Sequence, residues 1–133
     1  MFAERILCDR FSIFGCESFH SQEIYSKLEI DLGAERVLMA QKDSVQIAIE
    51  VKSFSAASVV YEFHQAIGQY IHYRMVLRQI QPDRKPYLAV PSEIYQRFFQ
   101  TPFFHDSLEE NQVRLLLVDP DLEEVKQWIP EPL

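Results

Sequence analysis

The chain has 133 residues, of which 47% are hydrophobic and 25% charged, a balance that predicts one folded domain over residues 1–133. Its 20 acidic and 13 basic residues give a net charge of -7, which argues against a stand-alone nucleic-acid binder. Any contact with DNA would have to be local, helped by a divalent ion, or supplied by a partner. The two cysteines, Cys8 and Cys16, and the absence of an apolar leader or spanning segment indicate reduced thiols in a cytoplasmic protein that does not enter a membrane.

The first part of the chain predicts mainly strands. In chain order we expect a short helix at residues 4–10 and strands at 11–14, 25–32, 37–40 and 45–52, with a turn at 41–44. The last of these strands alternates most clearly: Val45, Ile47, Ile49 and Val51 point one way, and Gln46, Ala48, Glu50 and Lys52 the other.

The period then becomes helical. A long helix is predicted over residues 57–79, with an apolar stripe of Val60, Phe63, Ile67, Ile71 and Met75. Beyond it we expect a strand at 87–90, a helix capped by Ser92 and running to Gln100, a helical turn opened by Thr101-Pro102, and strands at 113–118 and 125–129. Antiparallel early strands and helix-separated later ones predict an α/β fold, a mixed β-sheet with helices on both faces.

A charged set on the central strands carries the chemical prediction. Glu50 and Lys52 leave one face of a strand, about 6.8 Å apart along it, while the opposite face is apolar. A second carboxylate, from Asp31, would complete an oxygen-rich site for Mg²⁺ or Mn²⁺. With a tight turn at 41–44, Glu35 rather than Asp31 lies opposite Glu50, so Glu35 is the alternative carboxylate.

This order of residues resembles the PD-(D/E)XK nuclease superfamily, in which an Asp on one strand precedes Glu-x-Lys on the next and a helix follows. The helix carries Gln69 and Tyr73, a Gln-xxx-Tyr pattern similar to that of the RecB-like branch. In that branch this helix face lies over the metal site. The resemblance implies a restriction-endonuclease-like fold and supporting roles for both residues.

A more specific resemblance is to the XisH family, the fdxN-element excision controlling factor of cyanobacteria. It covers about residues 25–130 and rests on the ordered motifs IDLGAER at 30–36, IEVKSF at 49–54, QAIGQY at 65–70, YLAVP at 87–91 and WIP at 128–130. It implies a role in programmed DNA excision beside a recombinase and a small companion protein, XisI. It also adds Gln65 to the supporting residues, whereas residues 1–24 are atypical for the family.

Two functions remain open from the sequence. In one, the protein is a Mg²⁺- or Mn²⁺-dependent endonuclease, in which Asp31 and Glu50 bind metal and Lys52 stabilises the transition state or assists the base. In the other, it is a catalytically inactive accessory factor that binds XisI or the recombination machinery. Glu-x-Lys alone is weak, since alternating charge on a strand usually marks a solvated face. Four phenylalanines are expected to be mostly core, with some left for a partner or homodimer surface: Phe98, Phe99, Phe103 and Phe104.

Overall fold

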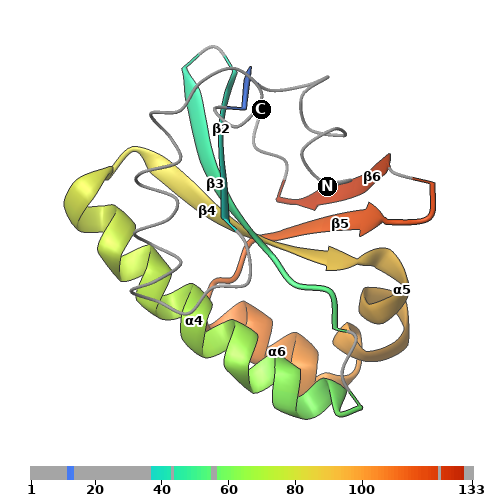
Figure 1. Ribbon diagram of the computed structural model, residues 1–133. Helices are drawn as coiled ribbons and strands as arrows, with labels where there is room; N and C mark the ends of the chain where they lie inside the picture. The colour runs from blue at the N-terminus through green and yellow to red at the C-terminus, as the bar shows by residue number, and fades with distance from the viewer. Residues whose placement is uncertain (1–11, 14–36, 43, 55–56, 123, 131–133) are drawn as a thin grey trace.

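The computed structural model describes residues 12–13, 37–42, 44–54, 57–122 and 124–130. Their strands form one mixed six-stranded sheet in the order β1-β2-β3-β4-β5-β6 (Figure 1). The strands are β1 (Ser12–Ile13), β2 (Val37–Lys42), β3 (Val45–Val51), β4 (Arg84–Pro91), β5 (Leu115–Asp119) and β6 (Glu124–Ile129). The helices are α4 (Val59–Ile80), α5 (Ser92–Ile94), the π-helical turn η1 (Tyr95–Phe99) and α6 (Pro102–Glu110). None of the described helices is long and apolar enough to cross a membrane.

The strand directions confirm the predicted mixed sheet. β1, β2 and β3 are successively antiparallel, β3, β4 and β5 are parallel, and β6 returns antiparallel to β5. The two parallel connections are the ones that contain helices, because a parallel crossover needs a long segment to return to the same end of the sheet. The α/β fold class is therefore confirmed, and it is compatible with a restriction-endonuclease-like architecture.

The β2–β3 hairpin differs from the predicted turn at 41–44. Lys42 pairs with Val45, so the connection has only two residues. Two-residue loops match the twist of antiparallel strands best, which favours the longer pairing. The register therefore puts Val37 opposite Glu50, and the prediction that Glu35 occupies this place is wrong.

Helix α4 begins and ends close to the predicted positions, and Phe63 and Ile67 are buried as predicted, but the rest of its buried stripe differs. Val60 is 47% exposed and Met75 49% exposed. The buried stripe contains Phe63, Ala66, Ile67, Tyr70, Tyr73 and Leu77. The prediction failed because it left out the tyrosines, whose rings are apolar and whose hydroxyls find buried partners.

The predicted cap at Ser92 is also wrong. Pro91 is the N-cap, with extended backbone and no side-chain capping hydrogen bond, and Ser92 is the first helical residue. Since Pro91 still belongs to β4, the strand passes directly into the helix. The next helix begins with Pro102 in its first turn after Thr101, as predicted.

The two faces of the sheet carry separate apolar clusters. One contains Ile47, Ile49, Val51, Tyr87, Ala89, Leu116, Val118 and Trp128, as the alternation of β3 predicts. The other lies under the described helices, with α4 and α6 side by side below the sheet in Figure 1. It contains Leu88, Val90, Leu115 and Leu117 from the strands and Phe63, Phe99, Phe104 and Leu108 from the helices. The helix expected at residues 4–10 lies outside the described part of the chain.

The four neighbouring phenylalanines divide between core and surface, as expected: Phe98, Phe99, Phe103 and Phe104. Phe99 and Phe104 are buried and stack at 5.7 Å between ring centroids, and Phe63 of α4 meets both rings edge to face. Phe103 is 55% exposed. Phe104 therefore attaches α6 to α4, whereas its neighbour Phe103 leaves its ring at the surface.

Candidate functional site

Glu50 is the central residue of the candidate site. It lies near the carboxyl end of β3, between β2 and β4, and its exposed fraction is 0%. Its parallel neighbour on β4 is Leu88, a member of the cluster beneath the helices, so Glu50 belongs to the helix-covered face. Burial of a carboxylate costs several kcal/mol unless a partner or a cation compensates it. A residue of this kind is therefore uncommon in a strand kept only for packing.

Lys52 follows on the same strand edge. Regular pairing ends at Val51, but the backbone N–H of Lys52 still donates to the carbonyl of Ala89 at 3.0 Å. The ladder thus extends the alternation of β3, which places Lys52 on the Glu50 face. Its half-buried side chain keeps access to solvent. The predicted pairing of an acid and a base on one face is consistent with this backbone.

The chain turns sharply just after the Glu-x-Lys segment. Phe54 has φ of 54°, a left-handed conformation that is rare for a bulky residue. Its ring is buried and meets Phe99 edge to face, 5.4 Å between centroids. Packing against η1 therefore fixes the direction of the backbone as it leaves Lys52.

Helix α4 brings Tyr73 and Gln69 to this face. Tyr73 is buried, and its hydroxyl donates to Sδ of Met39 at 3.9 Å. Met39 pairs with Ala48, two residues before Glu50. Because α4 returns from β3 to the parallel strand β4, its earlier turns lie nearer the carboxyl end of β3. Gln69, one turn before Tyr73, is half-buried.

The remaining predicted site residues stand apart. Gln65 is exposed, and its Nε2 donates to the hydroxyl of Tyr61 at 3.3 Å, on the solvent side of α4. Asp31 and Glu35 lie outside the described residues. Among the described residues, Glu50 and Lys52 thus share one face of the sheet, and Gln69 and Tyr73 belong to the helix that covers this face. Among them, the carboxylate and the amide carbonyl are oxygen donors of the kind that Mg²⁺ and Mn²⁺ accept.

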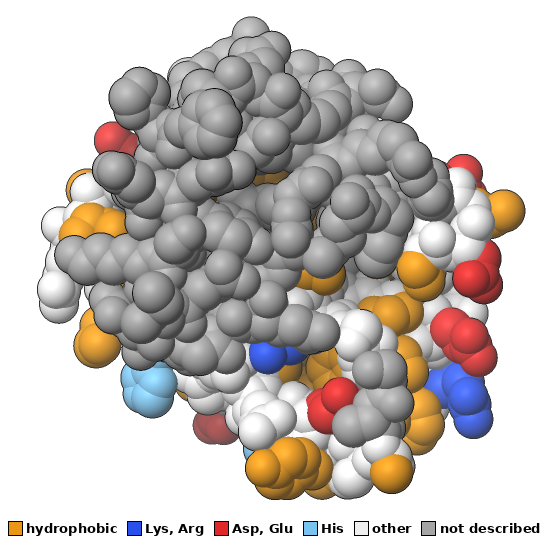
Figure 2. All heavy atoms as spheres, viewed as in Figure 1, with side chains coloured by type: hydrophobic (Ala, Val, Ile, Leu, Met, Phe, Trp, Pro, Cys, Tyr) orange, Lys and Arg blue, Asp and Glu red, His pale blue; other side chains and the backbone are white. Residues whose placement is uncertain are grey.

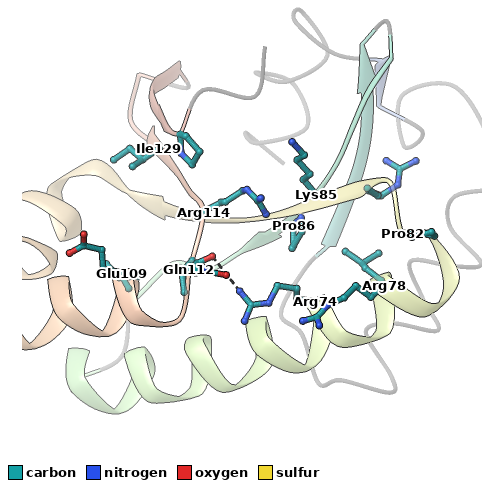
Figure 3. A pocket seen from close by; sticks show the side chains of 14 residues that line it. Arg74, Arg78, Pro82, Lys85, Pro86, Glu109, Gln112, Arg114 and Ile129 are labelled. Carbon is teal, nitrogen blue, oxygen red and sulfur yellow. Dashed lines mark hydrogen bonds between the residues drawn. The ribbon is translucent and has the colours of Figure 1, made fainter.

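A basic cleft at the other end of the sheet was not predicted. Its volume is about 710 Å³, and its cationic lining residues are Arg74, Arg78, Arg84, Lys85 and Arg114. Figure 3 shows their origins: Arg74 and Arg78 on α4, Lys85 on β4 and Arg114 at the entrance to β5. Four of these five residues fall between positions 74 and 85, a local concentration that the acidic net charge concealed.

The cleft exists because β4 and β5 start apart. Their pairing begins only at Leu88 and Leu115, and Pro86 before it has no backbone N–H to offer. The buried hydroxyl of Tyr70 takes the missing place: it donates to the carbonyl of Pro86 at 2.9 Å and accepts from the backbone N–H of Arg114 at 3.1 Å. Burial raises the pKa of Tyr70 above 10.0, although both arginines near it, Arg114 and Arg74, oppose the rise.

One further group of potential ligands lies on α6. Atoms of His105, Asp106 and Glu109 fall within 4.8 Å of one another, and all three residues are exposed. The imidazole Nδ1 is 3.5 Å from Asp106 Oδ1 and 3.4 Å from Glu109 Oε2. Imidazole and carboxylate side chains often lie this close together on an exposed helix surface, so this group is not a second candidate site. It provides a control position for metal-binding experiments.

The comparisons with known proteins agree with the fold and the motifs. The family model described as XisH protein matches residues 17–126. Two solved structures are similar: an XisH family protein from Nostoc punctiforme and a fdxN element excision controlling factor protein from Anabaena variabilis. Each is 46% identical with a TM-score of 0.68, over 70% of this chain and 73% of the other. No functionally curated protein matches. Because the family model spans most of the sequence, this chain belongs to the XisH family.

Proposed function

We propose that this protein acts in programmed DNA excision as a Mg²⁺- or Mn²⁺-dependent endonuclease. The description of the Anabaena variabilis relative as a fdxN element excision controlling factor supports the biological setting. One observation supports the chemistry: Glu50 is a fully buried carboxylate at the carboxyl end of a central strand, two residues before Lys52.

The burial of Glu50 supports a site because a carboxylate is expensive at that place. On the same face of the sheet, β4 contributes Leu88 and Val90, both fully buried in the cluster under the helices. An apolar residue at position 50 would satisfy packing alone, and desolvation of the carboxylate costs several kcal/mol. A metal ion bound at this carboxylate would offset part of that cost.

Each candidate residue has a proposed role. Glu50 would hold the ion, with Asp31 as the second carboxylate. When bound, the ion would polarise the phosphodiester and activate water. Lys52 would place its positive charge beside the phosphoryl group as negative charge develops there. Gln69 and Tyr73 would orient the site from α4, and the exposed Gln65 takes no direct part.

The test is cleavage of plasmid DNA with Mg²⁺ or Mn²⁺, with and without an XisI-like companion. Wild type is compared with Lys52→Ala and Glu50→Gln, and Lys126→Ala serves as the control because Lys126 is exposed and bonds only to Glu124 among the described residues. We expect metal-dependent cleavage that falls by a factor of about 100 or more in Lys52→Ala. Equal cleavage by wild type and Lys52→Ala, or no cleavage in any mixture, would contradict the proposal.

The accessory-factor function remains the alternative, and an exposed apolar surface favours it. Figure 2 shows apolar side chains gathered at the lower edge of the molecule, over the first turns of α4. Val60, Tyr61 and Phe103 are the large exposed apolar residues there, and the rings of Phe103 and His64 are 6.0 Å apart. Exposed apolar patches often mark protein contacts. A stable complex with an XisI-like companion that Phe103→Ser weakens, without any cleavage, would favour this function.

A further inference from the structure

The basic cleft contains cations of two kinds. Two of its arginines are engaged in holding the fold together. Arg84 is buried and donates from Nη1 to the carbonyl of Ile47 at 2.8 Å and from Nε to Oε1 of Gln81 at 2.6 Å. Arg74 donates from Nη1 to the carbonyl of Asn111 at 2.7 Å, at the C-terminus of α6, where a cation is favoured.

The other three cations are less engaged, although the side chain of Arg114 also interacts with the hydroxyl of Tyr70. Among the described residues, Arg78, Lys85 and Arg114 form no side-chain ion pair. Glu109 is the one acidic residue in the lining. Its carboxylate lies 3.4 Å from His105 and points away from Arg114 in Figure 3. Among the described residues, the lining of the cleft therefore carries a surplus of positive charge, although the net charge of the chain is -7.

The chemistry of the ligand follows from the arrangement of the three cations. They come from three different elements, α4, β4 and the start of β5, and border one concave space. A planar carboxylate is matched by one guanidinium fork, whereas a phosphate offers oxygens in several directions and more charge. A concave site with low-dielectric walls also concentrates the field of its charges. Leu77, Leu108 and Val113 supply such walls.

We propose that the basic cleft binds a phosphate group, supplied by a nucleic-acid backbone or by a free nucleotide. The cleft lies at the amino ends of β4 and β5, whereas Glu50 lies near the carboxyl end of β3, which runs parallel to them. A phosphate held there is thus separate from the site at Glu50. The inference does not depend on nuclease activity, and it supplies the local cation surface that DNA contact requires in an acidic protein.

The test measures binding without any divalent ion, in EDTA, so that the Glu50 site contributes nothing through a metal. Fluorescence anisotropy of a fluorescein-labelled DNA duplex is compared for wild type, for Lys85→Gln, and for the triple variant Arg78→Gln, Lys85→Gln, Arg114→Gln. The control is the double variant Arg97→Gln, Lys126→Gln, which removes two exposed positive charges elsewhere, and it is matched by the double cleft variant Arg78→Gln, Lys85→Gln. Thermal unfolding of each variant verifies that it is folded. Titration calorimetry with dAMP and with inorganic phosphate forms the second arm.

We expect the duplex to bind wild type and the control alike, and the triple cleft variant at least tenfold more weakly. The slope of log K against log salt should fall by about 0.9 for each cleft cation removed. Binding of dAMP or inorganic phosphate without the duplex, lost in the same variant, would support the cleft and identify the free nucleotide as the source. Equal binding by the double cleft variant and the control, or no binding of any phosphate, would overturn the inference. Displacement of the duplex by poly-L-glutamate as readily as by polyphosphate would overturn it in favour of an acidic protein partner.

Discussion

The described part of the sheet has one buried charged residue near each end, and the two side chains have different surroundings. Among the described residues, Glu50 and Arg84 are the charged residues that are buried, and they lie at opposite ends of the paired strands β3 and β4. Arg84 donates hydrogen bonds to the carbonyl of Ile47 on β3 and to the side chain of Gln81 at the end of α4, so it links these two elements. Glu50 lies on the helix-covered face beside Leu88, where we propose that its charge serves a metal site.

The same contrast extends to the neighbouring residues. Glu50 shares its face of the sheet with the half-buried Lys52, and Gln69 and Tyr73 belong to the helix that covers this face. Arg84 lines a concave surface with four other cations. We therefore expect the end near Glu50 to act on a phosphodiester and the end near Arg84 to bind a phosphate. The two can be separated by mutation.

The largest expected effect separates cutting from binding. Lys52→Gln should lower the maximal rate of metal-dependent DNA cleavage by a factor of about 100, with no change in the DNA concentration needed for half-maximal rate. Lys85→Gln should raise that concentration several-fold and leave the maximal rate unchanged. Steady-state cleavage of a labelled duplex measures both quantities. If both variants changed the same quantity, the two ends would not have separate roles.

Metal binding should stabilise the protein through Glu50. At a Mn²⁺ concentration of 100 times its Kd, we expect the free energy of unfolding to rise by about 2.7 kcal/mol. The increase should vanish in Glu50→Gln and persist in Glu109→Gln, which alters the exposed group on α6. Urea unfolding with and without Mn²⁺ measures it. Loss of the increase only in Glu109→Gln would place the ion on α6.

The hydroxyl of Tyr70 should contribute to stability because it hydrogen-bonds two backbone groups near the start of the β4–β5 pairing that do not bond to each other. Tyr70→Phe leaves the carbonyl of Pro86 and the N–H of Arg114 without it and should lower the free energy of unfolding by about 1–3 kcal/mol. The control is Tyr61→Phe, at an exposed position, with a change within about 0.5 kcal/mol. Urea unfolding compares them, and equal effects would contradict the bridging role.

The same hydroxyl predicts a pH dependence. Burial raises the pKa of Tyr70 in the folded protein above 10.0, so the folded state holds this proton more tightly than the unfolded state does. The contribution is complete below pH 10.0 and is lost as the pH rises through the folded pKa. Wild type should therefore lose more stability than Tyr70→Phe as the pH rises above 10.0. Urea midpoints over this range that fall in parallel would refute the assignment.

The smallest effect concerns the end of α6 beside the cleft. Gln112 has φ of 52°, and its N–H and that of Val113 bond to the carbonyls of Glu109 and Leu108, a Schellman ending. Glycine adopts this conformation without steric cost, so Gln112→Gly should stabilise by about 0.5–1 kcal/mol. The same change at Gln79, inside α4, should destabilise by about 1 kcal/mol. Two changes of the same sign would contradict this account.

The sequence was sufficient where a local period determined the structure. The alternation of β3 placed Glu50 and its apolar opposite face correctly, because a two-residue period needs no information from other elements. The stripe of α4 was right only in part, because burial of Tyr70 and Tyr73 depends on partners from β2, β4 and the segment before β5. The hairpin register was misplaced by the length of one loop.

The site was predicted in part for the same reason. Glu50 and Lys52 share one strand, and Gln69 and Tyr73 share one helix, so each pair follows from spacing. Gln65 was assigned by resemblance and proves to be exposed, and the assignments of Asp31 and Glu35 stay predictions. The basic cleft was missed because it joins α4, β4 and the start of β5, and only the separation of β4 from β5 opens it.

The most direct test of the site at Glu50 is anomalous scattering from crystals soaked in Mn²⁺. We predict a manganese peak within coordination distance of the Glu50 carboxylate, absent in crystals of Glu50→Gln. A peak only at His105, Asp106 and Glu109, or no peak on the chain, would contradict a metal-dependent site at the carboxyl end of β3.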